Sequence, residues 1–136
     1  MELKKLHLKV ITHEKVVFDD DVDAVYATGE KGEFGILSGH IPFMTALKIC
    51  VVRAVKDGQT IPIATMGGAF QVKENDCIIL TQVAELAADI DVARAKEAKD
   101  RAEARLGAQQ EALDRHRAEL ALAKAMARLK ATSMKW

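Results

Sequence analysis

The chain has few cysteines, prolines and aromatic residues, and it has no long hydrophobic run. Two of its 136 residues are cysteines, two are prolines and 4% are aromatic. No segment approaches the roughly 18 consecutive apolar residues of a membrane-spanning helix. The first five residues lead directly into an alternating segment and not into a signal-peptide core. We therefore expect one modest core with an appendage, in a protein that stays where it is made.

The residues that commonly build metal and catalytic sites are scattered along the chain. Cys50 and Cys77 do not form a Cys-x-x-Cys pair, and β-branched apolar residues surround each of them, so we expect buried, reduced thiols. The four histidines have no spacing that lets two imidazoles share an ion: His7, His13, His40 and His116. We therefore predict no metal site and no catalytic residues, and we expect histidines that are solvated or in turns.

The first part of the chain alternates between apolar and polar residues with a period of two, which is typical of half-buried strands. Turn-forming residues at 56–58 and 74–76 separate some of the alternating segments. We expect strands at 6–12, 22–27, 51–55, 60–66, 69–73 and 77–83. Short strands at this spacing predict an antiparallel β-sandwich or barrel.

Two glycine-containing segments interrupt this alternation, at 32–42 and 66–70. We expect tight bends or close backbone approach there. A phosphate-binding loop is disfavoured, because no Gly-Lys-Ser/Thr follows and no helix is expected to begin nearby. The acidic run 19–21 lacks the later glycine and glutamate of a calcium loop, so we interpret it as a solvated turn.

The chain changes character near residues 89–91, after which it is almost entirely alanine, leucine and charged residues. Asp91 is a good N-cap, and Gly107 is the only interruption before Thr132, so we expect two helices joined by a turn around 108–110. The predicted fold is α+β, with an antiparallel β-sandwich or barrel at 1–88 and a helical hairpin at 89–136. Alanine supplies much of the hairpin's apolar surface, so the hairpin should be only marginally stable alone.

The second helix carries two apolar stripes when its residues are placed at 100° intervals. One contains Leu113, Leu120 and Ala127, and the other contains Ala118, Leu122, Ala125, Met126 and Leu129. One stripe can meet the first helix, while the other needs the sandwich or a partner. The hairpin is therefore either docked permanently or able to exchange one surface for another, as a switch requires.

Charge is also sorted along the chain, although the formal net charge is zero. Residues 1–88 carry nine basic and twelve acidic residues, whereas residues 89–136 carry eleven basic and eight acidic ones. Arg94, Arg101 and Arg105 lie near Asp91 on the first helix, and Arg117, Lys124 and Arg128 share a face of the second. Facing each other, these stripes would hold an anion such as phosphate, with Asp91 or Glu85 accepting hydrogen bonds from a base or ribose. The alternative is solvated charge with pairs such as Glu97–Arg101.

Three segments occur in the order found in one family of proteins. They are the glycine segment 32–42, Met66-Gly67-Gly68-Ala69-Phe70, and Ile90-Asp91-Val92-Ala93-Arg94-Ala95-Lys96, with two helices behind them. Along essentially its whole length the chain resembles the ε subunit of bacterial and chloroplast F-type ATP synthases. The resemblance implies an antiparallel β-sandwich of about ten short strands followed by the helical hairpin expected above.

The resemblance also implies a role, which is that of a non-catalytic rotor subunit coupling proton flow to ATP synthesis. The sandwich would bind the γ subunit and the c-ring, so the protein would lie peripherally on the cytoplasmic face of the bacterial cell membrane, associated with it only through Fo. The hairpin would alternate between a compact state and an extended state that reaches into the α/β ring and inhibits ATP hydrolysis. A basic face suits that extended state, since the β subunits of the family present an acidic segment: Arg115, Arg117, Lys124 and Arg128.

In bacillus-like members of the family, the compact hairpin binds regulatory ATP through an Ile-Asp-x-x-Arg-Ala motif. This chain matches the motif at Ile90, Asp91, Arg94 and Ala95, and Glu85, Arg101 and Arg128 fall on further positions that those members use. Lys124 stands where they typically have arginine, and lysine keeps the charge but loses the bidentate fork. ATP is thus implied as a regulatory ligand, while no cofactor is required and no nucleic acid partner is expected.

Two other classes of protein remain as alternatives. A hairpin that probes a channel also occurs in binding modules of other multisubunit machines, but such a module would not explain the glycine segments. A small barrel hydrolase or cupin would need clustered histidines and carboxylates, which this sequence does not show.

Overall fold

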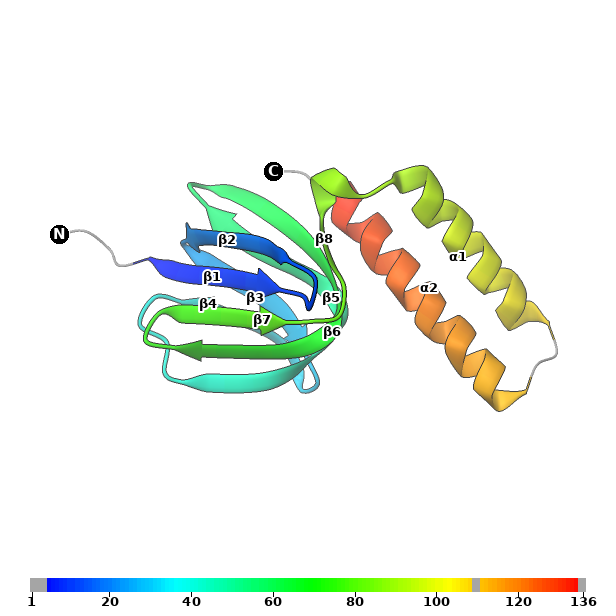
Figure 1. The fold of residues 1–136 in the computed structure, drawn as a ribbon, viewed down its shortest axis with the longest axis horizontal. Coiled ribbons are helices and arrows are strands. Elements are labelled where there is room, and N and C mark those ends of the chain that lie inside the picture. Colours follow the sequence, from blue (N-terminus) through cyan, green and yellow to red (C-terminus); the bar gives the residue numbers. More distant parts are fainter. Residues whose placement is uncertain (1–4, 109–110, 135–136) are drawn as a thin grey trace.

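Eight β-strands and two α-helices follow one another along the chain (Figure 1). The structure is a computed structural model that describes residues 5–108 and 111–134. The strands are β1 (Leu6–Ile11), β2 (Val16–Val22), β3 (Ala24–Gly29), β4 (Gly32–Leu37), β5 (Phe43–Lys56), β6 (Gln59–Lys73), β7 (Asp76–Leu80) and β8 (Ala84–Leu86). A short 3-10 turn, η1 (Ala87–Asp89), leads into α1 (Val92–Gly107) and α2 (Ala112–Ser133).

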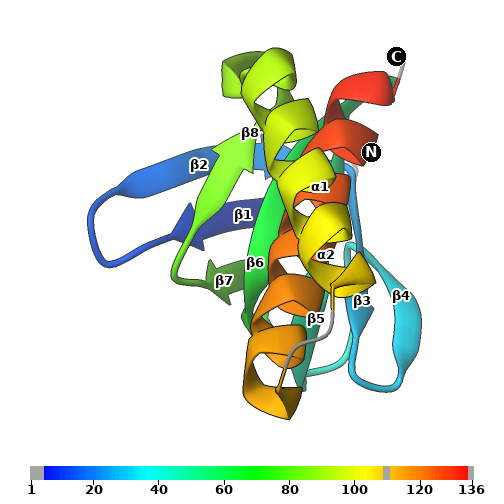
Figure 2. The same cartoon turned by 90° about the vertical axis from the view of Figure 1, so that its right-hand side faces the viewer.

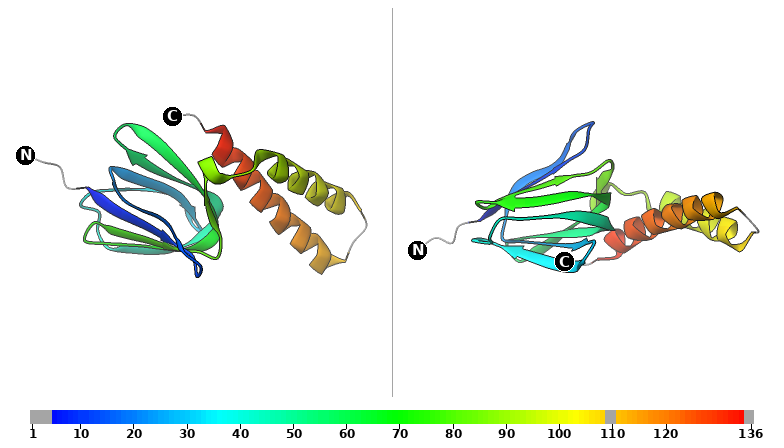
Figure 3. Two further views of the ribbon diagram at one scale, coloured as in Figure 1. Left: turned by 45° about the horizontal axis from the view of Figure 1, so that its top comes forward. Right: turned by 90° about the horizontal axis from the view of Figure 1, so that it is seen from below.

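The strands hydrogen-bond in the order β2-β1-β7-β6-β5-β3-β4, with β8 pairing β6. Every pairing is antiparallel except that of β1 with β7. The sheet curls over on itself so that its two halves face each other (Figures 1 and 3). The predicted α+β fold, a β-sandwich followed by a helical hairpin, is confirmed.

Two long strands, β5 and β6, take the place of several short ones. They pair along most of their length, with a break in the ladder between the pairs Leu47↔Gly68 and Ile49↔Met66. Each long strand therefore continues from one half of the sandwich to the other, and the described residues form eight strands where the resemblance implies about ten. The separate strands expected at 60–66 and 69–73 are one strand, β6, and the glycines between them let it bend without ending.

Gly68 shows why glycine is needed at this bend. Its φ is +122°, and a Cβ atom built on it would lie 2.2 Å from the carbonyl oxygen of Leu80 on β7. A side chain is thus excluded both by backbone conformation and by the close approach of β7. The other glycine segment was expected to form tight bends or a close backbone approach, and residues 32–37 within it form a strand, β4, paired with β3.

The acidic run 19–21 lies in β2, so its interpretation as a solvated turn is wrong. Asp19 and Asp21 project from the exposed side of β2, where His7 of β1 lies between them. Nδ1 of His7 is 2.8 Å from Asp21 and Nε2 is 2.5 Å from Asp19, so this histidine is paired and not merely solvated. These hydrogen bonds, first that with Asp21 and then that with Asp19, raise the pKa of His7 above its ordinary value.

The core fills the space between the two halves of the sandwich. The buried side of β1 follows the predicted alternation, with Leu6, Leu8 and Val10 fully buried. Phe34 packs edge-on against Phe43 and Phe70, with ring centroids 5.3 and 5.0 Å away. Both cysteines are free, and the predicted burial is confirmed for Cys77 but is wrong for Cys50. Cys77 is buried, and burial raises the pKa of its thiol to about 11, whereas Cys50 on β5 is half-buried.

The helical hairpin begins where the sequence predicts. The carboxylate of Asp91 accepts a hydrogen bond of 3.1 Å from the backbone N–H of Arg94, which confirms Asp91 as the N-cap of α1. The first helix ends at Gly107, and the second begins at Ala112. The expected turn at 108–110 lies partly outside the described residues. Neither helix, within the residues that the structure describes, is long and apolar enough to cross a membrane.

The hairpin docks on the sandwich mainly through α2. That helix packs against β5, β6 and η1, while α1 packs along α2 on the far side from the sheet (Figure 2). The docking surface is a small cluster in which Ala131 of α2 meets Val51 and Ala64 of the sheet, together with Ala87 and Ile90. Of the predicted apolar stripe formed by Leu113, Leu120 and Ala127, the two leucines remain 61% and 40% exposed, whereas Ala127 is buried.

Candidate functional site

A cavity of about 410 Å³ lies where the sandwich, the start of α1 and the C-terminal half of α2 meet. Strand β8 and the turn η1 form its floor, and the two helices form its walls. Nine residues line it: Glu85, Asp89, Ile90, Asp91, Arg94, Ala95, Ala98, Arg101 and Arg128. All seven residues of the ATP site implied by the resemblance are thus brought to one cavity, although they come from three different elements.

The start of α1 supplies most of one wall. Ile90 is buried in the docking cluster, and Asp91 caps the helix, so the first turn is fixed relative to the sandwich. From there Arg94, Ala98 and Arg101 follow at intervals of four and three residues, which places them on one face of the helix. The N-terminus of a helix is also favourable for negative charge, because its first N–H groups have no partner within the helix.

Arg128 reaches the cavity from α2 and is tied to the sandwich. Its Nε donates a hydrogen bond of 2.6 Å to Oε1 of Glu85 on β8, and both side chains are mostly buried. A ligand that enters the cavity next to α2 would therefore have to fit around these two side chains. Arg128 is therefore both a wall of the cavity and a tie between hairpin and sandwich.

The remaining arginines of the cavity are free to bind an anion. Among the described residues, neither Arg94 nor Arg101 has a carboxylate within 4.0 Å. The predicted alternative pair Glu97–Arg101 is therefore absent, and the i,i+4 pair on this helix is Lys99–Glu103 at 3.7 Å. Two unpaired guanidinium groups beside three carboxylates suit a ligand with both phosphate oxygens and hydrogen-bond donors.

The basic face of α2 is divided by the docking. Arg115, Arg117 and Lys124 are exposed, whereas Arg128 is turned into the cavity. Lys124 does not line the cavity, although the resemblance places it among the nucleotide-binding positions.

Sequence reasoning missed two lining residues, Asp89 and Ala98. Ala98 has a signal that periodicity can find, because it lies one turn beyond Arg94 and Ala95 on the same helix face. Asp89 has no such signal, since its position depends on the turn η1 between strand and helix.

Together these features define a class of protein, a β-sandwich that carries a docked helical hairpin with an arginine-rich cavity between them. Two sequence models match the chain in succession, the β-sandwich domain of the ATP synthase delta/epsilon chain over residues 5–87 and the long α-helix domain of the same chain over residues 88–133. The chain therefore belongs to the ε-subunit family of ATP synthases, whose members are non-catalytic subunits.

Curated relatives are similar to this chain over almost its full length. The ATP synthase epsilon chain of Desulforamulus reducens is 46% identical over 128 residues, which cover 94% of this chain and 97% of the relative. That of Bacillus licheniformis is also 46% identical, over 93% of this chain and 97% of the relative.

Solved structures share the fold at lower identity. A chain of the Euglena gracilis mitochondrial ATP synthase superposes with a TM-score of 0.81 at 21% identity, covering 96% of this chain and 82% of that one. A chain from the central stalk and c-ring of the Tetrahymena thermophila mitochondrial enzyme gives a TM-score of 0.65 at 14% identity, covering 98% and 100%.

Proposed function

We propose that this chain is a rotor subunit of an F-type ATP synthase, and that its hairpin binds regulatory ATP when docked and inhibits ATP hydrolysis when extended. Family membership supports the rotor role, and the cavity supports the nucleotide. The observation that carries the nucleotide proposal is the convergence of seven residues on one cavity in which Arg94 and Arg101 are unpaired.

The ligand would act by holding the hairpin down. The cavity has walls from α1, α2 and the sandwich, so a molecule that fills it binds the docked arrangement and not the released one. The docking cluster on α2 is built around Ala131, a small side chain that buries little area. Weak docking is what allows a ligand of moderate affinity to shift the balance between the two states.

Release of the hairpin would complete the inhibitory face. Arg115, Arg117 and Lys124 are exposed in either state, but Arg128 is held by Glu85 while α2 is docked. Undocking would free Arg128 to join the other three on a basic helix, which suits an acidic segment of the catalytic α/β ring. The docked structure would thus keep one residue of the inhibitory basic face apart from the other three.

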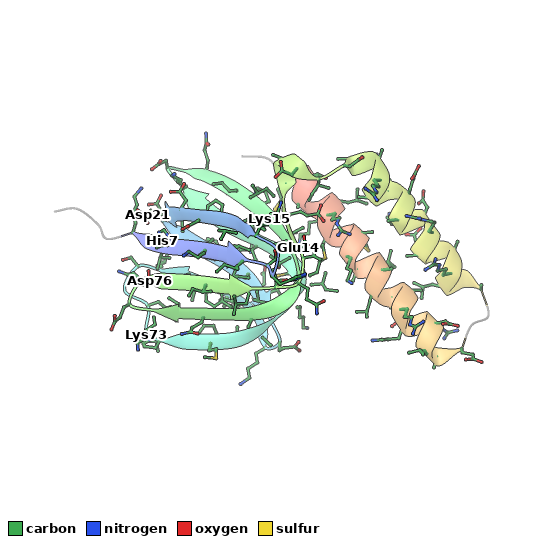
Figure 4. All side chains as sticks on the ribbon, in the orientation of Figure 1. His7, Glu14, Lys15, Asp21, Lys73 and Asp76 are labelled. Atoms are coloured by element: carbon green, nitrogen blue, oxygen red, sulfur yellow. The ribbon has the colours of Figure 1, made fainter. Side chains whose placement is uncertain are left out.

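The end of the sandwich away from the hairpin offers a surface for the γ subunit and c-ring, and through Fo for peripheral attachment to the membrane. Figure 4 shows Lys73 and Asp76 at this end, with Glu14 and Lys15 at the other. The loop after β4 lies at the same end, because the backbone N–H of Gly39 donates to Oδ1 of Asn75. Near it Leu37, Ile41 and Met44 are 59%, 75% and 69% exposed, an apolar grouping that fits contact with another subunit.

The proposal is tested by titrating the full chain with ATP while following the thiol of Cys50. Cys50 is half-buried, packs against the core of the sandwich and also lines a hollow between β5 and α2, so its alkylation should accelerate when the hairpin leaves, whereas buried Cys77 serves as an internal reference. We expect calorimetric binding of ATP and slower alkylation of Cys50. Arg101→Gln should weaken ATP binding about tenfold, since it removes a charged hydrogen-bond donor without affecting the helix cap.

Arg105→Gln is the matched control. Arg105 is an exposed arginine one turn further along α1 that does not line the cavity, so its replacement should leave ATP affinity unchanged. Lys124→Arg should also change little, because Lys124 lies one turn before Arg128 on the same face of α2 and does not line the cavity. Equal effects of Arg101→Gln and Arg105→Gln would show that the cavity is not the nucleotide site.

A further inference from the structure

A second hollow of about 660 Å³ lies on the opposite side of α2 from Arg128. At 100° per residue, the helix residues that line it, among them Ala123, Met126 and Lys130, are centred about half a turn of the helix away from Arg128. Its other wall comes from the sheet, mainly from residues 48–53 of β5. The groove therefore separates the hairpin from the sandwich along a face that the nucleotide cavity does not touch.

The floor of the groove is aliphatic and sulfur-containing. Ile49, Cys50 and Val51 of the sheet and Met126 and Leu129 of the helix line it, with Met134 beyond the end of α2, while Cys50 also packs against the core of the sandwich. Met126 keeps 51% of its surface exposed although it lies in this hollow. Flexible, unbranched side chains of this kind adapt to apolar ligands, and pockets of several hundred Å³ with such walls are typical of small-molecule sites.

Positive charge surrounds this apolar floor. Two of the four cationic side chains already have partners, Arg53 with Glu33 at 3.0 Å and Lys99 with Glu103 at 3.7 Å. The other two, Lys48 on β5 and Lys130 on α2, are exposed and have no carboxylate within 4.0 Å among the described residues. One free ammonium group thus stands on each wall, on the sandwich and on the hairpin.

We propose that this groove binds the carboxylate of a single long acyl chain, with the chain along the floor and the carboxylate at the lysines. The apolar floor favours a hydrocarbon chain, and the unpaired Lys48 and Lys130 favour one negatively charged group at the end of that chain. A nucleotide fits less well, because the floor offers no free guanidinium fork and no aromatic ring. The inference goes beyond the nucleotide proposal and does not depend on it.

Binding here would stabilise the docked hairpin. The acyl chain would contact β5 and α2 at once, so it would bind the docked arrangement more tightly than the released one. The fatty acid and ATP would then favour the same state from opposite sides of α2. The chain would thereby respond to free fatty acids as well as to nucleotide.

The experiment uses isothermal titration of the full chain with octanoate, decanoate and laurate below their micelle concentrations. We expect affinity to rise about three- to fourfold for each added methylene that enters the groove. The double variant Lys48→Gln/Lys130→Gln should bind laurate about tenfold more weakly. Lys73→Gln/Lys96→Gln is the matched control, since it removes one exposed lysine from the sandwich and one from the hairpin outside the groove, and it should bind laurate normally.

Three further results bear on the proposal. Laurate should slow alkylation of Cys50, and Met126→Gln should weaken laurate binding without affecting the fold. Arg101→Gln should leave laurate binding intact, which separates this site from the nucleotide cavity. Affinity that does not depend on chain length, equal losses in the two double variants, or equally tight binding of dodecylammonium would overturn the assignment.

Discussion

Nε of Arg128 on α2 donates a 2.6 Å hydrogen bond to Oε1 of Glu85 on β8. Among residues 5–108 and 111–134, this is the ion pair that joins the hairpin to the sandwich, since every other pair lies within one of the two. The apolar part of the docking is small and largely alanine. A single polar tie therefore makes a sizeable contribution to whether the hairpin stays down.

Glu85→Gln should loosen the docked hairpin. The pair is partly exposed, so its loss should cost about 1 kcal/mol, which corresponds to about a fivefold increase in the released fraction. Alkylation of Cys50 should accelerate by the same factor in the absence of nucleotide. The control is Glu103→Gln, which removes the carboxylate of an ion pair within α1, and it should leave the rate unchanged.

The charge of His7 should make the sandwich more stable at mildly acidic pH. Hydrogen bonds with Asp21 and Asp19 raise the pKa of His7 in the folded protein above its unfolded value of about 6.5. The stabilisation is therefore fully present below the unfolded pKa and is lost as pH rises through the folded pKa. The melting-temperature difference between the parent chain and His7→Gln should be largest near pH 5.5 and small near pH 9.

Two further measurements check this assignment. Because His7 is substantially exposed, added salt should reduce the difference at pH 5.5. His116→Gln, on the exposed surface of α2, should show no comparable pH dependence, and an equal effect of both substitutions would contradict the role of the Asp19–His7–Asp21 contacts.

Gly68→Ala should destabilise the sandwich severely. The added methyl group would lie 2.2 Å from the carbonyl oxygen of Leu80, at a φ of +122°. Gly58→Ala is a matched control with a positive φ of +78° and no atom within 4 Å of the added carbon, so it should cost only about 1–2 kcal/mol. In urea unfolding, Gly68→Ala should lower the free energy of unfolding by clearly more, about 3 kcal/mol or above. Similar losses in Gly68→Ala and Gly58→Ala would show that β7 can move aside.

These glycines also show what the sequence could and could not predict. Alternation revealed β1 because its buried positions are all large and apolar, but it divided β6 at Gly67 and Gly68, where a strand bends without ending. The alternation did not reveal β2, an edge strand, because three consecutive aspartates interrupt its apolar/polar pattern. Charged residues at a sheet edge protect it from pairing with other chains, so they obscure the pattern for a functional reason.

The candidate site, too, could be predicted from the sequence only in part. The residues of the cavity followed from a motif, because Ile90 to Ala95 are contiguous and begin a helix at a recognisable N-cap. The Glu85–Arg128 pair could not be derived from spacing, since it depends on how α2 is rotated and placed on the sheet. The position of Lys124 outside the cavity depends on where along the sheet α2 is placed, since Lys124 and Arg128 share one face of the helix.

Ala131→Asp should release the hairpin without removing it. Ala131 is fully buried against Val51 and Ala64, so a carboxylate there would be desolvated without a partner while α2 stays docked. We expect fast alkylation of Cys50, weak ATP binding and an unchanged urea transition of the sandwich. Ala104→Asp, at an exposed alanine of α1, should change none of these, and a normal rate of Cys50 alkylation in Ala131→Asp would mean that docking does not depend on this cluster.

Deleting residues from Asp89 onward should raise ATP hydrolysis by the assembled complex while leaving assembly intact. All eight strands precede this point, so the sandwich and its exposed end would remain for the other subunits. Ala131→Asp should do the opposite and lower hydrolysis, because it frees the basic helix while keeping it attached. Hydrolysis assays on complexes carrying each variant distinguish an inhibitory hairpin from a purely structural one. An inhibitory hairpin predicts changes of opposite sign for the two variants, whereas a structural one predicts the same change for both.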